Sequence, residues 1–172
     1  MARSGAVTFK GNPMTLAGEA VQVGANAPDF TVHYYEGGLK AYTPADFKGK
    51  PTIISVVPSL DTGVCQKQTK RFNDELGSLG DQINAVTISL DLPFAMNRFC
   101  GAESIKNLRN GSDYMDRSFG RNWGVLIEEL KLLARATFVL DKDGRVTYAE
   151  VVPEVTNEPN YEAALAALKS LL

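Results

Sequence analysis

The sequence predicts an α/β fold in which helices flank a central mixed sheet. Two continuous apolar runs, PTIISVVP (51–58) and NAVTISL (84–90), are typical of strands that are buried on both faces. Between these runs, from Thr62 onward, apolar side chains recur at helical spacing until Gly80 ends the pattern. A strand, a helix and a second strand in this order predict neighbouring parallel strands joined by a right-handed crossover.

The chain before the first buried strand predicts three smaller elements. Residues 7–16, VTFKGNPMTL, read as an N-terminal β-hairpin that turns at Gly11 and Asn12. In DFTVHYY (29–35) apolar residues alternate with polar ones, which indicates a strand with one buried face. The stretch TPADF (43–47) is typical of a short helical turn. The N-terminal part of the chain is therefore expected to be mostly β.

After the second buried strand, DLPFAMNRFCGAE (91–103) predicts a short helix that Pro93 opens and that carries Cys100. Two further strands, ARATFVL and RVTYAEVV, flank the hairpin turn DKDG (141–144). The last residues, 160–172, place apolar side chains on one face of a helix. This order is the thioredoxin-like arrangement, and we expect a single domain over residues 1–172.

The composition is that of an ordinary globular protein, with 44% hydrophobic and 22% charged residues among 172. The net charge of −2 shows no sign of the basic surface that nucleic-acid binding requires. No apolar run reaches the length of a signal peptide core or a membrane span, so we expect a cytoplasmic protein. Two cysteines are too few for the disulfide framework of a secreted domain, and a reducing compartment would keep them as thiols.

The cysteine at position 65 lies in PSLDTGVC (58–65), where a helix begins directly after a strand. Asp61 or Thr62 can cap this helix, which places Cys65 in the first turn. The free N–H groups and the dipole of a first turn stabilise an anion, and the thiolate is the reactive form of cysteine. Because a free thiol has a pKa of about 8.5, only about 3% of it is thiolate at neutral pH. Fast chemistry also needs groups that stabilise charge developing on a substrate.

Two neighbours of Cys65 suit such chemistry. Thr62 lies three residues earlier and so on the same side of the first turn, where its hydroxyl can face the sulfur. Pro58 ends the buried strand, cannot donate a hydrogen bond and can exclude water. Taken singly, Thr62 is an ordinary helix cap and Cys65 a small buried apolar residue.

Other interpretations of these residues remain open from the sequence. His33, the only histidine, could serve Cys65 as a base in a cysteine hydrolase, although its place in the alternating strand indicates a half-exposed residue. A zinc site formed by His33, Cys65 and Cys100 lacks a fourth ligand and any compact spacing. The protein could also be a binding module with inert cysteines. For a cationic partner of the sulfur, Arg71, Arg98 and Arg135 all qualify, and Arg135 has the one hint that it opens a mostly apolar strand.

Pro58, Thr62 and Cys65 match the P-x-x-x-T-x-x-C motif of peroxiredoxins. Together with SLDLPFAMNRFCGAE (89–103), this stretch resembles the thiol peroxidase subfamily, the atypical two-cysteine bacterial type. The similarity covers nearly the whole chain and includes the N-terminal hairpin and LLARATFVLD (132–141).

The resemblance implies an enzyme that reduces hydrogen peroxide and organic hydroperoxides. In it, Cys65 would be the peroxidatic cysteine, and Cys100 would resolve its sulfenic acid as an intramolecular disulfide. Thr62 would hold the peroxide, Pro58 would shield the sulfur, and Arg135 would be the active-site arginine. The resemblance also implies thioredoxin as the reductant and a homodimer. No metal, haem or flavin cofactor is expected, because sulfur carries both electrons.

Overall fold

The structure is a computed structural model that describes residues 1–172. Its strands are β1 (Arg3–Phe9), β2 (Asn12–Leu16), β3 (Val32–Tyr35), β4 (Leu39–Tyr42), β5 (Thr52–Val56), β6 (Asn84–Ser89), β7 (Arg109–Ser112), β8 (Leu126–Ile127), β9 (Leu132–Leu133), β10 (Ala136–Leu140) and β11 (Val146–Val151). Its helices are α1 (Gly63–Leu76), α2 (Pro93–Ala102), α3 (Ser118–Asn122) and α4 (Tyr161–Lys169), with 3₁₀ turns η1 (Pro44–Phe47) and η2 (Gly80–Gln82). No helix combines the length and the apolar character that crossing a membrane requires.

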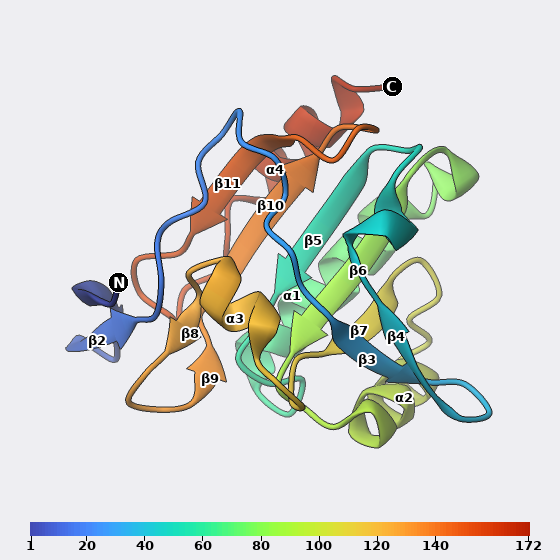
Figure 1. The fold of residues 1–172 in the computed structure, drawn as a ribbon. Helices are drawn as coiled ribbons and strands as arrows, with labels where there is room; N and C mark the ends of the chain where they lie inside the picture. The colour runs from blue at the N-terminus through green and yellow to red at the C-terminus, as the bar shows by residue number, and fades with distance from the viewer.

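A seven-stranded mixed sheet forms the centre of the molecule, in the order β11-β10-β5-β6-β7-β3-β4 (Figure 1). β5, β6 and β7 run parallel, whereas β10, β11, β3 and β4 join antiparallel. α1 connects β5 to β6, so the parallel crossover predicted from the sequence is confirmed. A smaller sheet has the order β1-β2-β8-β9.

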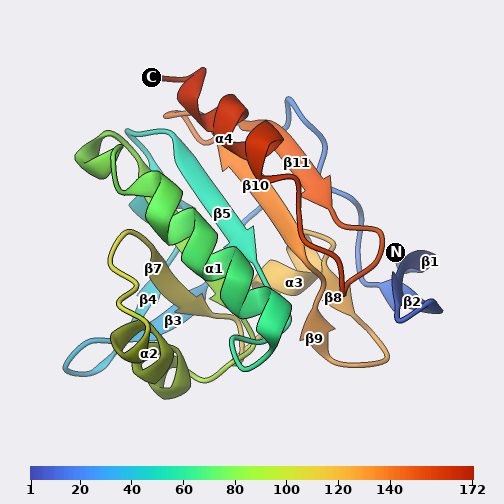
Figure 2. The same cartoon turned by 180° about the vertical axis from the view of Figure 1, so that it is seen from behind.

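Both faces of the central sheet are covered. α1 and α4 lie side by side on one face, with α2 at one end, and α3 and the small sheet cover the other (Figures 1 and 2). In β5 every residue is buried: Ile54 and Val56 belong to the core shared with α3, and Ile53 to the core shared with α1 and α4. Because successive side chains of a strand point to opposite faces, a sheet covered on both sides requires the continuous apolar run of this sequence.

The other predicted elements are present, with two corrections. The N-terminal hairpin turns at Lys10 and Gly11, one residue earlier than expected, because Phe9 pairs with Asn12 and both turn residues adopt the positive φ of a two-residue hairpin loop. The N-terminal hairpin, the helical turn, the strand around His33, the helix with Cys100 and the last hairpin and helix all form. α1, however, ends at Leu76 and not at Gly80. The Asn107 side chain donates a hydrogen bond of 2.7 Å to the Asn73 carbonyl, the acceptor that Gly77 N–H would use in a continuing helix. Gly77 N–H bonds Asp74 O instead, so the last turn tightens and the helix stops.

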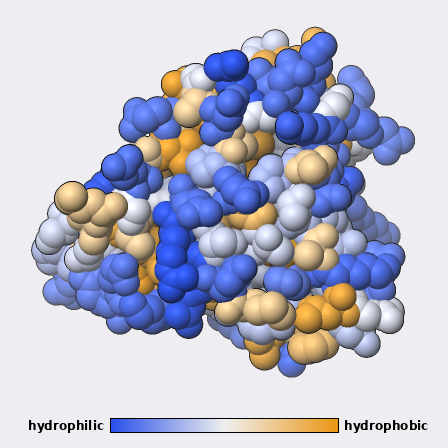
Figure 3. Space-filling view, in the orientation of Figure 1, coloured by the Kyte–Doolittle hydropathy of each residue, from blue (hydrophilic) through white to orange (hydrophobic).

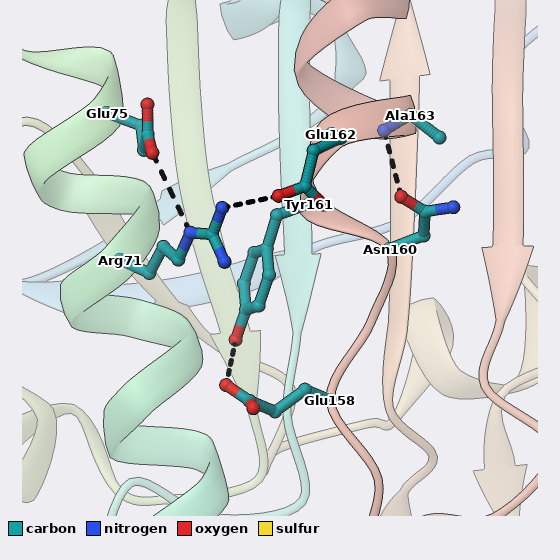
Figure 4. A network of polar contacts seen from close by, with 7 residues as sticks. All are labelled: Arg71, Glu75, Glu158, Asn160, Tyr161, Glu162 and Ala163. Carbon is teal, nitrogen blue, oxygen red and sulfur yellow. Dashed lines mark hydrogen bonds and ion pairs between the residues drawn. The ribbon is translucent and has the colours of Figure 1, made fainter.

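α1 and α4 are joined at the surface by a network of polar contacts (Figure 4). Arg71 of α1 contacts Glu162 of α4 at 2.7 Å and Glu75 of its own helix at 3.7 Å. Its guanidinium also lies 4.3 Å from the centre of the Tyr161 ring, whose hydroxyl donates to Glu158. Arg71 therefore has surface carboxylates and an aromatic face as its partners.

Candidate active site

Cys65 lies in the first turn of α1, the helix that follows β5 in the chain, and is 0% exposed. Of the two possible caps, Thr62 occupies the N-cap position, with an extended backbone (φ −111°, ψ 148°). Its hydroxyl makes no capping bond to the helix backbone. Instead it donates to Cys65 Sγ at 2.7 Å and is 3.0 Å from the Ser59 carbonyl oxygen. The residue expected to cap the helix thus directs its side chain at the sulfur.

Arg135 is brought to the same sulfur from the start of β10. Arg135 is 2% exposed, and its Nη2 donates to Cys65 Sγ at 3.5 Å. Nε donates to the Val155 carbonyl at 2.9 Å, and Nη1 to Gln68 Oε1 at 3.0 Å. Gln68 is itself buried and fixed by a bond to Ser55 Oγ at 2.8 Å. Neutral oxygens hold the guanidinium in place and no carboxylate pairs with it, so its charge is available to an anion at Cys65.

The three arginines that the sequence left as candidates are separated by the structure. Arg135 touches the sulfur, Arg71 pairs with glutamates of α1 and α4, and Arg98 lies exposed on α2. Gln68 was not singled out from the sequence. The sequence feature that could have identified it is a polar residue on the otherwise apolar face of the helix, about one turn after Cys65.

A pocket of about 320 Å³ opens above this cluster. Its walls are formed by Phe9, Lys10, Pro58, Ser59, Thr62, Gly63, Val64, Leu132, Arg135, Val155 and Thr156. Pro58 is buried at the end of β5, and Cys65 lies beneath the pocket, in hydrogen-bond contact with Thr62 and Arg135 of its wall. Phe9 and Lys10 come from the end of β1, so the N-terminal hairpin is part of the pocket, which the sequence did not predict.

Glu154 fastens the hairpin to the pocket. Its carboxylate accepts hydrogen bonds from Thr8 Oγ1 at 2.9 Å and from Gly11 N–H at 2.8 Å, both in the hairpin. It also accepts bonds from the hydroxyl of Thr156 at 2.6 Å and from its N–H at 2.9 Å. The Thr156 hydroxyl and N–H, followed by the Gly11 N–H, lower the pKa of Glu154 from 4.5 to about 2.

Replacing Glu154 by glutamine is expected to loosen the hairpin with a defined pH dependence. Because the folded-state pKa is depressed, the stabilisation is complete above the unfolded value of 4.5 and is lost as the pH falls towards about 2. The difference in melting temperature between wild type and Glu154→Gln should therefore be constant above pH 4.5 and shrink below it. Thermal unfolding between pH 2 and 7 measures this. Glu36→Gln, which alters an exposed carboxylate that accepts no hydrogen bond, is the control, and an equal trend in it would contradict the assignment.

Cys100 lies near the end of α2 and is partly buried. Burial raises the pKa of its thiol, and a hydrogen bond from Asn110 Nδ2, 3.6 Å from Sγ, lowers it. Desolvation is the larger effect, so the Cys100 thiol is held in its neutral form. Cys65 and Cys100 are both free thiols in this structure and belong to different helices.

His33 is half-buried on β3, as its place in the alternating strand predicts. Its ring lies 6.1 Å from that of Tyr114, its Nδ1 has no hydrogen-bond partner, and no hydrogen bond joins it to Cys65. No group of three His, Cys, Asp or Glu side chains is placed to hold a metal ion. The base of a cysteine hydrolase is therefore not assembled at this sulfur.

The chain matches the Redoxin family over residues 22–165. It is 56% identical to a thiol peroxidase of Bacillus subtilis, over 96% of this chain and 98% of that protein. Among solved structures, a peroxiredoxin-like protein from Aquifex aeolicus superposes with a TM-score of 0.88 at 38% identity, over 99% of this chain and 98% of that one. A thiol peroxidase from Chromobacterium violaceum shares the fold, with a TM-score of 0.81 at 20% identity over 95% of both chains. The thioredoxin-like fold is thus confirmed, and the chain belongs to the Redoxin family and, within it, to the thiol peroxidases.

Proposed function

We propose that this enzyme is a thiol-dependent peroxidase that reduces hydrogen peroxide and organic hydroperoxides at Cys65. The observation that supports this most directly is the environment of Sγ: a hydroxyl donor at 2.7 Å and a guanidinium donor at 3.5 Å converge on one buried sulfur beneath a pocket. The family membership of the chain, with relatives that are named thiol peroxidases, points to the same activity.

The first step is attack by the Cys65 thiolate on the terminal oxygen of the hydroperoxide. An S–O bond forms and the O–O bond breaks; the sulfur loses two electrons and becomes a sulfenic acid, and the alkoxide takes up a proton and leaves as the alcohol. The Thr62 hydroxyl can donate to the thiolate or to the peroxide, and to the Ser59 carbonyl when Cys65 is protonated. Arg135 offers its positive charge to the thiolate and to the departing oxygen. Pro58 keeps water from the sulfur.

The second step needs a second thiol, and Cys100 is the only other one in the chain. Its sulfur attacks the sulfenic acid, so that an S–S bond forms, the S–O bond breaks, and the hydroxyl leaves as water with the proton of the thiol. In this structure the two sulfurs have different hydrogen-bond partners: Thr62 and Arg135 contact Cys65, and Asn110 contacts Cys100. A disulfide requires Cα atoms within about 7 Å, and we propose that the segments around the two cysteines open locally so that the sulfurs meet.

Replacing Cys100 by serine is expected to stop the enzyme at the sulfenic acid. One equivalent of hydrogen peroxide or cumene hydroperoxide should be consumed rapidly, and turnover with a dithiol protein should be lost. Trapping with dimedone followed by mass spectrometry identifies which cysteine has become the sulfenic acid. The same protein with activated acyl esters is the control for hydrolase chemistry. Rapid ester hydrolysis without peroxide consumption would contradict the proposed function.

Thr62→Val keeps the shape of the side chain but removes its hydroxyl. If that hydroxyl stabilises charge in the reaction, the second-order rate with peroxide should fall by about tenfold, a typical loss for one hydrogen bond to a charged group. Stopped-flow tryptophan fluorescence measures the rate. Thr62→Ser, which retains the hydroxyl, should restore most of it. Equal rates for Thr62→Val and wild type would mean that the contact with Cys65 Sγ has no part in the chemistry.

We further propose thioredoxin as the reductant, because a disulfide between Cys65 and Cys100 must be reduced by an external dithiol. A cytoplasmic location fits this, since a reducing compartment returns both cysteines to thiols. We also propose that the protein forms a homodimer. Its interface would be the apolar surface where α2 meets the β3–β4 hairpin, and Figure 3 shows apolar side chains together at this end of the molecule. Its exposed side chains are Tyr35, Leu39, Leu92 and Phe94, with the rings of Tyr35 and Phe94 5.2 Å apart.

A further inference from the structure

Asp91 lies in the short connection between β6 and α2 and is the centre of a group of hydrogen bonds. One carboxylate oxygen accepts a bond of 2.7 Å from the Ser59 hydroxyl. The other accepts bonds of 2.7 Å from Leu60 N–H and from the Ser89 hydroxyl. The Asp91 carbonyl also accepts a bond from the hydroxyl of Ser112. Because Ser89 and Ser112 are buried at the ends of β6 and β7, Asp91 is held by the sheet and holds the turn that follows β5.

That turn leads directly to the reactive sulfur. The Ser59 carbonyl accepts bonds from Thr62 N–H at 3.2 Å and from the Thr62 hydroxyl at 3.0 Å. The same hydroxyl donates to Cys65 Sγ at 2.7 Å. A continuous chain of contacts therefore runs from Asp91 through Ser59 and Thr62 to Cys65. Bonds to an ionised carboxylate are the strong ones in such a chain.

Asp91 also stands two residues before Pro93, the first residue of α2, which carries Cys100. One carboxylate thus ties the turn in front of the Cys65 helix to the start of the Cys100 helix. The loop that leads from α2 to β7 is also tied to α1, because the Asn73 side chain accepts bonds from the N–H groups of Lys106 and Asn107.

We propose that Asp91 is a positioning residue that acts on the two chemical steps in opposite directions. By fixing the Ser59–Thr62 turn, it keeps the Thr62 hydroxyl on Cys65 and favours the reaction with peroxide. By tying that turn to the start of α2, it opposes the local opening that lets Cys65 and Cys100 meet. This inference rests on the proposed function, since it assigns a residue outside the pocket to the same two steps.

The test compares wild type with Asp91→Ala in single-turnover stopped flow with hydrogen peroxide. The second-order rate of Cys65 oxidation is expected to fall about tenfold, because the Thr62 donor is no longer held in place. The rate of the following disulfide formation is expected to rise about fivefold, because the folded arrangement that keeps the thiols apart is less populated. Hydrogen exchange of the reduced variant should show lost protection in residues 58–65 and 92–103, with β5 unchanged.

Two further variants keep the outcome decisive. Ser59→Ala removes one hydrogen-bond partner of Asp91 with a minimal change. It should also slow Cys65 oxidation and speed disulfide formation, each by a smaller factor, so it replaces Asp91→Ala if that variant does not fold. Asp61→Asn removes an acid of the same turn that accepts no hydrogen bond and should not move the two rates in opposite directions. Two rates that fall together, or that stay unchanged, would refute the role of Asp91 while wild-type activity still supports the proposed function. A wild-type protein that does not consume peroxide would refute the proposed function itself.

Discussion

Replacement of Cys65 by serine is expected to abolish peroxide reduction and to leave the fold intact. Serine is nearly isosteric with cysteine and fits the buried position without a cavity. Its hydroxyl is far less nucleophilic at neutral pH unless a base removes the proton. The groups that contact this position are a hydroxyl and a guanidinium, neither of which is such a base. Stopped-flow measurement of the consumption of hydrogen peroxide and of cumene hydroperoxide tests this loss of activity.

Cys100→Ser is the matched control, since it makes the same chemical change at the other thiol and should retain the first turnover. Equal melting temperatures of the two variants would show that the loss is chemical. Substantial turnover by Cys65→Ser would overturn the assignment of Cys65 as the nucleophile.

Arg135→Lys is expected to lower the second-order rate with peroxide by about a hundredfold, in the range seen when a donor to developing negative charge is removed from a buried site. Lysine keeps the positive charge but cannot reproduce the fork of donors that contacts Val155 O, Gln68 Oε1 and Cys65 Sγ together. Its ammonium would satisfy part of this set and leave the rest unpaired. The rate is measured with limiting enzyme by stopped-flow fluorescence.

Arg71→Lys makes the same substitution on the surface of α1, where the side chain pairs with glutamates (Figure 4), and should leave the rate unchanged. Near-wild-type rates in Arg135→Lys would mean that charge alone is sufficient at the sulfur and that the fork of donors plays no part.

Much of the fold could be predicted because its signals are local. The unbroken apolar runs of β5 and β6 predict buried strands, and in α1 the apolar residues recur at helical spacing. β7 could not be found in this way, because its sequence RNGS contains no β-branched or aromatic residue. It is a strand because β6 pairs with it from Val86 to Ser89, and β3 adds to its other side at Ser112. Pairing with distant strands decided its conformation against its local preference.

In the candidate site, too, the features set by adjacent residues could be predicted and those set by distant residues could not. The strand, turn and helix that place Cys65 in a first turn can be predicted from adjacent residues, as can the side of the turn on which Thr62 lies. The choice of Arg135 over Arg71 and Arg98 could not be made from the sequence without the family resemblance. Arg135 is 70 residues from Cys65, and only the pairing of β10 with β5 brings the two together.

By itself, the sequence determined a parallel crossover whose helix carries a cysteine in its first turn, together with a second cysteine on a short helix. The tertiary structure alone decided which groups surround that sulfur: Gln68 and Val155 hold the arginine, the N-terminal hairpin supplies part of the pocket, and Asp91 holds the turn. Strand period and helix capping depend on neighbours within a few residues, so they are visible in the sequence. Hydrogen bonds between residues that are tens of positions apart depend on the order of strands in the sheet, which no local spacing records.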